Sequence, residues 1–487
     1  MPNEKVSEYG DRLQKLAELK EMGINPYPSK TNRTHQIKSV LDDFGQLEKK
    51  KTSLVLAGRL MSQRGHGNLT FGNIQDGSGK IQIALSKKEI GAENYKIFTK
   101  LIDIGDFIEI KGVCFLTHKG EKSIMTEKWM LLSKALRPLP EKWHGLQNEE
   151  ERYRKRYLDL LINNELKEIF KKKEKFWETT RQFMKNRGFT EVETPTLETT
   201  TGGAEANPFI THHNDLNLDL YLRISIGELW HKRLMAAGYE KTFEIGRMYR
   251  NEGSSPDHLQ EFTNMEFYWA YANYEDGMKF SKELFQTIAR EVFGKTKFKT
   301  RGYEFDLAGE WKKIDYQKEI LKQTKIDILK ATEDEIKKKL KQLNIKYEGT
   351  NKERLVDSLW KYCRKTINGP AFLVNHPKLV SPLAKEDEKK RELTERFQII
   401  IAGSEAGNGY SELNNPVEQK KRFEIQQKLL EGGDKEAMMP DWEFVEMVEY
   451  GMPPTCGFGF GERLFCFLAD ISAREATLFP LMKPKNK

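Results

Sequence analysis

Cysteine is scarce in this sequence, which has only four among 487 residues. Cys114, Cys363, Cys456 and Cys466 stand far apart, and no two of them have CxxC spacing. Neither a zinc site nor a disulfide framework is therefore indicated. The reducing cytosol is the compartment that fits this cysteine usage.

Long hydrophobic runs and a large excess of one charge are also missing. A membrane-spanning helix needs about 20 apolar residues in a row, and no such run occurs. The first residues, MPNEKVSEYGDRLQKL, are charged and lack the apolar stretch of a secretory signal. Lys and Arg number 81 against 73 Asp and Glu, so the formal charge of +8 permits nucleic-acid binding without requiring it. We expect a cytoplasmic protein that does not associate with membranes.

The first part of the chain predicts a small β-barrel behind a helical extension. Residues 1–52 hold an amphipathic helix pattern, and residues 53–136 hold about five short alternating strands separated by glycine-rich turns. This spacing is typical of an OB-fold, which commonly binds oligonucleotides. Phe71 would stack on a base, with Arg64 and Gln82 for hydrogen bonds. The alternative is that Phe71 is a residue of the barrel core.

The rest of the chain predicts a second, larger domain. Residues 137–148 contain two prolines and read as a linker, and residues 149–487 follow with mixed strand and helix patterns. Within them, about 312–368 is rich in Lys and Glu and is predicted as a helical insertion between two parts of a sheet. The predicted fold class is α+β, with an antiparallel sheet flanked by helices after the barrel.

Polar chemistry gathers on one predicted hairpin, residues 243–268. Two strands flank a polar loop from Gly253 to Glu261, and side chains alternate faces along each strand. One face would carry a cation, carboxylates, rings and an amide: Arg250, Glu252, Phe262, Asn264, Glu266 and Tyr268. An arginine suits a phosphate, and acids suit a buried amine. The alternative is a solvated sheet face, where mixed charges are common.

Three other segments carry similar patterns. Glu228 stands at the start of a predicted helix, where its alternative role is an interaction with the helix dipole. Glu405 precedes a strand that alternates three polar residues onto one face: Asn408, Tyr410 and Glu412. The glycines of GFGFG (457–461), just before Arg463, would admit a ligand close to the backbone, although packing explains them equally well.

Three long stretches stand in one order along the chain: TEVETPTL (190–197), FEIGRMYRNE…EFTNMEFY (243–268) and GFGFGER (457–463). They resemble the three motifs of class II aminoacyl-tRNA synthetases and, more narrowly, of the lysyl-tRNA synthetase family. Further stretches similar to that family are RYLDLLIN, GGAEANPFITHHN, SPLAK, NGYSELN, EYGMPPT and FPLMKP. The resemblance covers roughly residues 8–484, the barrel included.

The resemblance implies a reaction in two steps: lysine and ATP give lysyl-adenylate and pyrophosphate, and lysine then passes to the 3′ end of tRNA(Lys). It implies that Arg250 and Arg463 are catalytic, because they would stabilise charge on the phosphates. ATP would lie among Arg250, Glu252, His258, Phe262, Glu405 and Arg463. Phe262 would stack on adenine, and His258 would reach the β- and γ-phosphates. Mg²⁺ is the implied cofactor.

The same resemblance implies three further sets of residues. The lysine pocket would be formed by Gly203, Glu228, Glu266, Tyr268, Asn408, Tyr410 and Glu412. In the barrel, the positions that read the anticodon would be Arg64, Phe71 and Gln82, with Glu127 as a weaker match. Pro195 would lie in the interface of a homodimer.

Two departures from the family pattern affect these expectations. Glu405 and Glu412 are implied as metal ligands, but the glutamate usual seven residues before Glu405 is replaced by Gln398. An amide offers an oxygen without charge, so Gln398 is a weak ligand and one metal site should be weaker or absent. GFGFGER is one residue shorter than the usual third motif, which leaves the register of its glycines relative to Arg463 open.

Two other functions stay open at this point. A related ligase could attach lysine to a protein, although such enzymes lack the anticodon barrel. A catalytically inactive, RNA-binding relative would be consistent with Gln398 and the short third motif. Aspartyl and asparaginyl synthetases share the architecture, but acids at Glu266 and Glu412 suit a cation better than an aspartate.

Overall fold

The computed structural model describes residues 7–140, 146, 148–204, 206–253, 255, 258–347, 349, 351–434 and 437–485. The chain divides into two compact units, Met1–Glu149 and Glu150–Lys487, which we describe separately. The predicted linker falls at this division, and its residues 141–145 and 147 lie outside the described residues.

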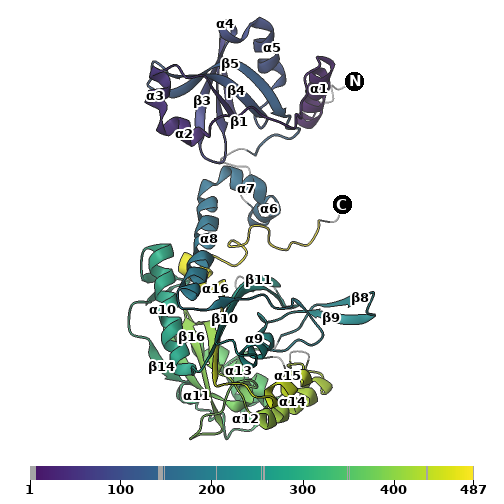
Figure 1. The fold of residues 1–487 in the computed structure, drawn as a ribbon, viewed down its shortest axis with the longest axis vertical. Coiled ribbons are helices and arrows are strands. Elements are labelled where there is room, and N and C mark those ends of the chain that lie inside the picture. Colours follow the sequence, from purple (N-terminus) through teal and green to yellow (C-terminus); the bar gives the residue numbers. More distant parts are fainter. Residues whose placement is uncertain are drawn as a thin grey trace. The chain divides into compact units, whose positions relative to one another are not determined.

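The first unit is built on a closed five-stranded barrel with the strand order β1-β2-β3-β5-β4 (Figure 1). Its strands are β1 (Leu54–His66), β2 (Leu69–Gln75), β3 (Lys80–Ser86), β4 (Phe107–Leu116) and β5 (Lys122–Ser133). The turn after β2 forms because the Asp76 carboxylate accepts hydrogen bonds from the amides of Ser78 (2.7 Å) and Gly79 (2.9 Å). The predicted OB-type barrel is confirmed.

Five helices pack around this barrel: α1 (Glu8–Glu21), α2 (Ile37–Asp42), α3 (Phe44–Lys49), α4 (Lys87–Ile90) and α5 (Ala92–Leu101). Leu19 of α1, Val40 of α2 and Phe44 of α3 are buried in the same hydrophobic core as the strands. The helices of the predicted N-terminal extension therefore complete the barrel's core.

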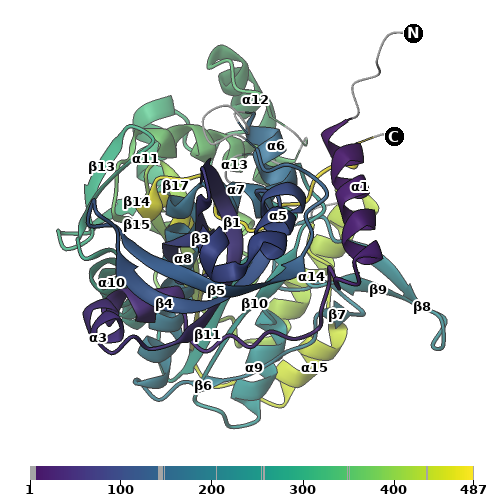
Figure 2. The ribbon, with the colours of Figure 1, turned by 90° about the horizontal axis from the view of Figure 1, so that it is seen from above.

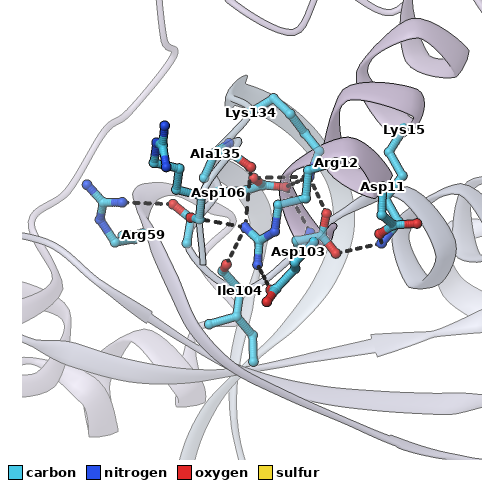
Figure 3. Close-up of polar contacts among 12 residues, drawn as sticks. Asp11, Arg12, Lys15, Arg59, Asp103, Ile104, Asp106, Lys134 and Ala135 are labelled. Atoms are coloured by element: carbon cyan, nitrogen blue, oxygen red, sulfur yellow. Dashed lines mark hydrogen bonds and ion pairs between the residues drawn. The ribbon is translucent and has the colours of Figure 1, made fainter. Parts of the chain in front are cut away.

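Buried charges attach α1 to the barrel (Figure 3). The Arg12 guanidinium, only 5% exposed, donates to the carbonyls of Ile104 (3.1 Å) and Ala135 (3.3 Å). Beside it, Lys134 pairs with Asp106 at 3.0 Å, and both side chains are fully buried. This network orders the start of the chain against the loop that precedes β4.

The second unit is organised around an eight-stranded sheet with the order β14-β15-β16-β17-β18-β11-β10-β6. The strands are β6 (Thr190–Glu191), β10 (Lys241–Tyr249), β11 (Glu261–Ala270), β14 (Lys312–Asp315), β15 (Ala371–Pro377), β16 (Leu393–Ile401), β17 (Ser404–Ser411) and β18 (Thr455–Gly461). All neighbours are antiparallel except β6–β10 and β14–β15. The predicted antiparallel sheet is confirmed.

Smaller sheets and helices complete this unit. The sheet β7-β9-β8 comprises β7 (Leu197–Glu198), β8 (Ile210–His213) and β9 (Leu218–Leu222), and a hairpin comprises β12 (Lys297–Thr300) and β13 (Tyr303–Asp306). The helices are α6 (Glu149–Arg154), α7 (Arg156–Ile162), α8 (Asn164–Lys185), α9 (Glu228–Ala236), α10 (Tyr274–Phe293), α11 (Tyr316–Thr324), α12 (Glu333–Gln342), α13 (Lys352–Cys363), α14 (Pro416–Glu431), α15 (Trp442–Glu449) and α16 (Arg463–Ala469). No helix among the described residues is both long and apolar enough to cross a membrane.

One face of the large sheet is covered by α8, α10 and α16. Met265 and Phe267 of β11 and Phe458 and Phe460 of β18 point into this core, where all four are at most 2% exposed. Since alternate residues face opposite sides of a strand, the polar residues between them face the other side. That second face carries the candidate site.

Element boundaries differ from the sequence predictions in two places. The range predicted as a helical insertion begins with a strand, because Lys312–Asp315 form β14 beside β15, and helices start only at Tyr316. In addition, β10 ends at Tyr249, so Arg250 and Glu252 follow the strand rather than belonging to it. The hydrogen bond from the Arg250 amide to the Gln260 carbonyl (2.9 Å) still holds Arg250 against the partner strand.

Candidate active site

Polar residues form continuous rows across the sheet on the face opposite the core. Glu266 of β11 lies opposite Gly459 of β18, which lies opposite Asn408 of β17, and Asn408 lies opposite Gln398 of β16. A second row, two residues along, contains Tyr268, Gly457, Tyr410 and Arg396 in the same order. The register thus brings residues far apart in sequence onto one surface.

The glycines of β18 make this surface concave. A Cβ on Gly457 would lie 2.1 Å from Glu412 Oε1, and one on Gly459 would lie 2.8 Å from Glu266 Cγ. A Cβ on Gly461 would lie 2.3 Å from Asn264 Oδ1. Each of these glycines therefore leaves room for one polar side chain of the site. This explains why glycine recurs at every second position of β18, which packing in the core would not explain.

A cavity of about 380 Å³ lies over these rows. It is lined by every residue predicted to hold ATP or lysine: Gly203, Glu228, Arg250, Glu252, His258, Phe262, Glu266, Tyr268, Glu405, Asn408, Tyr410, Glu412 and Arg463. The alternative of a plain solvated sheet face is therefore wrong. The roles given to the individual residues stay predictions.

One end of the cavity is acidic. Glu266 is 8% exposed; its Oε1 accepts from the Ile226 amide (2.9 Å) and its Oε2 from the Tyr268 hydroxyl (3.0 Å). Glu228 accepts from the Tyr410 hydroxyl. Gly203, at φ +93°, can only be glycine here, since a Cβ would lie 2.7 Å from the Glu228 Cβ.

Burial changes how these acids titrate. Burial first, and then the charge of Glu228, raise the pKa of Glu266 to about 7. Burial likewise raises the pKa of Glu412 to about 8, against the opposing effect of Lys232. Carboxyls whose pKa values lie near neutrality are typical of functional sites, and an incoming cation would favour their ionised forms.

Lys232 of α9 is a charged residue of this region that sequence reasoning missed. Its ammonium is 2.7 Å from Glu228 Oε1 and 2.6 Å from Glu412 Oε2, and its side chain is 1% exposed. The spacing of Glu228 and Lys232, four residues apart on one helix, was the available signal. Arg396 was missed as well; it lines the cavity and donates to Asn408 Oδ1 at 2.9 Å.

The other end of the cavity carries two arginine side chains among acids, because Glu252, Glu405 and Glu462 line it as well. The Arg250 guanidinium lies 5.6 Å from the centre of the Phe262 ring and donates to the Ile224 carbonyl at 3.4 Å. Arg463, the first residue of α16, donates to the Glu405 carbonyl at 3.2 Å. Burial lowers the pKa of Arg250 although nearby acids oppose the effect, and an arginine remains charged at neutral pH. Two guanidinium groups therefore border a space that an anion would occupy.

Known proteins match both units. Residues 148–483 match the family described as tRNA synthetases class II (D, K and N), and residues 54–132 match the OB-fold nucleic acid binding domain. The lysine–tRNA ligase of Pelotomaculum thermopropionicum is 44% identical over 98% of this chain and 94% of its own length. Those of Thermotoga maritima (42% identical) and Carboxydothermus hydrogenoformans (44%) cover 98% of this chain and 96% and 98% of their own. The chain belongs to the lysyl-tRNA synthetase family.

Membership in this family confirms the predicted fold and bears on the alternatives. The relatives match over nearly their full lengths, so the barrel is part of the shared architecture. A ligase that attaches lysine to a protein was expected to lack that barrel, so the barrel argues against this alternative. The short third motif does not displace its residues, because β18 keeps regular pairing from Thr455 to Gly461 and Arg463 lines the cavity.

The residues predicted to bind metal do not lie together. Gln398 and Glu405 contact each other, and Glu412 lies apart from them at the acidic end of the cavity. Gln398 Nε2 donates to Glu405 Oε2 at 2.8 Å, and Gln398 Oε1 is buried without a hydrogen-bond partner. Glu412 instead pairs with Lys232 at the acidic end. Among the described residues, no group of three or more His, Cys, Asp or Glu is placed to hold a metal ion. Glu405 lines the cavity and Gln398 does not, so one carboxylate is presented to a Mg²⁺ ion, which suits an ion held mainly by substrate phosphates.

The residues predicted to read the anticodon share one face of the barrel. Arg64 of β1 lies opposite Phe71 of β2, and Asn73, two residues further, lies opposite Gln82 of β3. Phe71 is half-buried and outside the barrel core, whereas Thr70, Gly72 and Ile74 point inward. The alternative of a core role for Phe71 is therefore disfavoured. Glu127 is exposed on β5.

Proposed function

We propose that this protein activates L-lysine with ATP, giving lysyl-adenylate and pyrophosphate, and then transfers lysine to the 3′ end of tRNA(Lys). The single observation that carries this proposal is the cavity that joins an acidic end to an end with two arginines, in a chain of the lysyl-tRNA synthetase family. Such a cavity can hold a diamino acid and a nucleoside triphosphate side by side.

In the first step, an oxygen of the lysine carboxylate attacks the α-phosphorus, and the bond to the pyrophosphate oxygen breaks. The attacking carboxylate carries no proton, so the step needs no general base. Arg250 and Arg463 neutralise charge that develops on the phosphates, and positioning supplies the rest of the acceleration. Phe262, facing Arg250, stacks on adenine, and Glu252 accepts from its amino group.

Lysine recognition falls to the acidic end. Glu228, Glu266 and Glu412 surround the two ammonium groups, and the Tyr268 and Tyr410 hydroxyls orient the acids. Asn408 and the backbone at Gly203 complete the pocket. A pocket built for a charged end group rejects an analogue without it by about 10⁴-fold or more, because its buried acids would stay unpaired.

Mg²⁺ fits this proposal as a partner of ATP. Glu405 would hold the ion through its carboxylate, and the ion would neutralise the phosphates during the displacement; Gln398, predicted as a weak ligand, lies outside the cavity lining and would act through Glu405. Glu412 was predicted as a ligand too, but its ion pair with Lys232 favours its role in the lysine pocket. Gln398 fixes the Glu405 side chain by donating its amide proton to it.

Lysine-dependent exchange of labelled pyrophosphate into ATP tests the first step. We expect exchange with lysine and none with norleucine, which is the same chain without the ε-amine. Charging of tRNA(Lys) then tests the second step. Absence of exchange at saturating lysine and Mg²⁺ would refute the proposal and would favour an inactive, RNA-binding protein.

The proposal also covers the oligomeric state and the cellular location of the protein. Exposed apolar side chains lie on the small sheet that begins two residues after Pro195: Leu197 (47%), Ile210 (65%), Leu216 (64%) and Leu218 (40% exposed). Three of them stand on or between β8 and β9, a hairpin that extends away from the rest of its unit (Figures 1 and 2). Exposed apolar groups of this kind favour a protein interface, here of a homodimer in the cytoplasm. Light scattering of the purified protein would test this, and a monomeric mass would contradict it.

A further inference from the structure

Lys232 is a buried cation directly behind the acidic end of the cavity: its partners Glu228 and Glu412 line the cavity, and Lys232 itself does not. It stands on α9, one turn after Glu228, and its ammonium lies between Glu228 on its own helix and Glu412 after β17. The rings of Tyr410 and Phe444 lie 5.5 Å and 5.7 Å from the ammonium. Lys232 thus links the helix to the far side of the pocket, and its side chain has almost no contact with solvent.

Three acids and one lysine form the set of paired charges at this end; Arg396, which also lines the cavity, donates to Asn408 Oδ1 and to the Val380 carbonyl instead. Three carboxylates, those of Glu228, Glu266 and Glu412, are each at most 8% exposed, and Lys232 is the cation in ion-pair contact with two of them. With all acids ionised, the set therefore carries two net negative charges. Free lysine presents two ammonium groups, one at the α-carbon and one at the end of its side chain. The two negative charges of the set then match the two positive charges of the substrate's ammonium groups.

We propose that Lys232 is a positioning residue for lysine recognition: by pairing with Glu228 and Glu412 it holds both carboxylates in fixed orientations and offsets one of the three negative charges that the acids can carry. This inference rests on the proposed function. Without Lys232, three buried carboxylates would face two ammonium groups, and the unbalanced acid would be costly to keep ionised. Glu228 and Glu412 would also lose the contact that joins them across the pocket.

Lys232→Met tests the proposal, because it removes the charge and keeps most of the side chain's length. In lysine-dependent pyrophosphate exchange, we expect the KM for lysine to rise about tenfold to hundredfold, in line with the loss of one partner of a buried charge pair. The KM for ATP and the kcat should stay within about threefold of the unchanged protein, since the contacts of Lys232 lie at the acidic end. Lys232→Arg, which restores the charge, should recover most of the affinity for lysine.

Arg233→Met is the matched control. Arg233 is the next residue of α9, and its guanidinium pairs at 2.9 Å with Asp441, which, unlike Glu228 and Glu412, does not line the cavity. Its loss removes a cation and an ion pair from the same helix without changing the charge of the pocket. We therefore expect an unchanged KM for lysine in this variant.

The outcomes separate the two proposals. If the unchanged protein shows no lysine-dependent exchange, the proposed function fails and this inference fails with it. If it exchanges but Lys232→Met keeps its KM for lysine, or loses ATP and lysine affinity equally, only the role of Lys232 is overturned. Should Lys232→Met not fold, Lys232→Gln carries the same comparison with Lys232→Arg, because its amide can donate to both acids without a charge.

Discussion

Replacing Gly457 by alanine should damage lysine binding selectively. The new Cβ would lie 2.1 Å from Glu412 Oε1 and 2.7 Å from Tyr268 Cε1. Ordinary contact begins at 3.4 Å, so the carboxylate would have to retreat by about 1.3 Å. Such a shift pulls the carboxylate away from its present position against the ion pair of its other oxygen with Lys232 at 2.6 Å, and toward the cavity that it lines.

A displacement of about 1 Å in a binding group costs about 100-fold, or ~2.7 kcal/mol. We therefore expect the KM for lysine of Gly457→Ala to rise about 100-fold in pyrophosphate exchange. The KM for ATP serves as the internal control and should change little, since the predicted ATP residues lie toward Arg250 and Arg463. A thermal melt confirms that the variant is folded. A folded variant with an unchanged KM for lysine would refute the placement of Glu412 in the pocket.

Three further predictions concern pH, tRNA and stability. The KM for lysine should rise as pH falls from about 8.5 to 6.5, because Glu266 and Glu412, with pKa values of about 7 and about 8, become protonated there and no longer attract ammonium groups; a flat profile would contradict this. Phe71→Ala should weaken tRNA charging while pyrophosphate exchange stays intact, and equal loss in both assays would exclude an anticodon role. Arg12→Met should lower the free energy of unfolding of the protein by about 2–4 kcal/mol, because buried carbonyls lose their donor. The control Lys38→Met breaks an exposed ion pair and should cost less than about 0.5 kcal/mol in the same denaturant titration.

The hairpin, the barrel and the polar residues of the cavity could be predicted from sequence because their signals are local. Alternation in EFTNMEFY assigned Met265 and Phe267 to the core and Glu266 and Tyr268 to the site, as the structure has them. The point where β10 ends could not be predicted in this way. It depends on where the chain turns away from the partner strand, which a pattern of alternating residues does not encode.

Lys232 shows why the remaining part of the site was missed. A lysine four residues after a glutamate usually marks an exposed ion pair on a helix. Here the pair is buried, because α9 packs against β11 and presents Glu228 and Lys232 to the sheet rather than to water. That orientation, and the proximity of Glu412, which follows β17 about 180 residues later, arise only from tertiary packing.

The charge of the acidic end also explains the choice of substrate within a family that covers three amino acids. Residues 148–483 match a family shared by enzymes designated D, K and N, so the fold alone does not separate aspartate, lysine and asparagine. A pocket for aspartate needs a cation free to meet a carboxylate. Two cations stand at this end, but Lys232 is paired with Glu228 and Glu412, and Arg396 donates to Asn408 and to the Val380 carbonyl, whereas Glu266 has no ion-pair partner among the described residues. To bind aspartate, the pocket would have to break those contacts and bury its three acids beside the side-chain carboxylate of the substrate. Lysine instead brings positive charges that offset the negative charges of the acids.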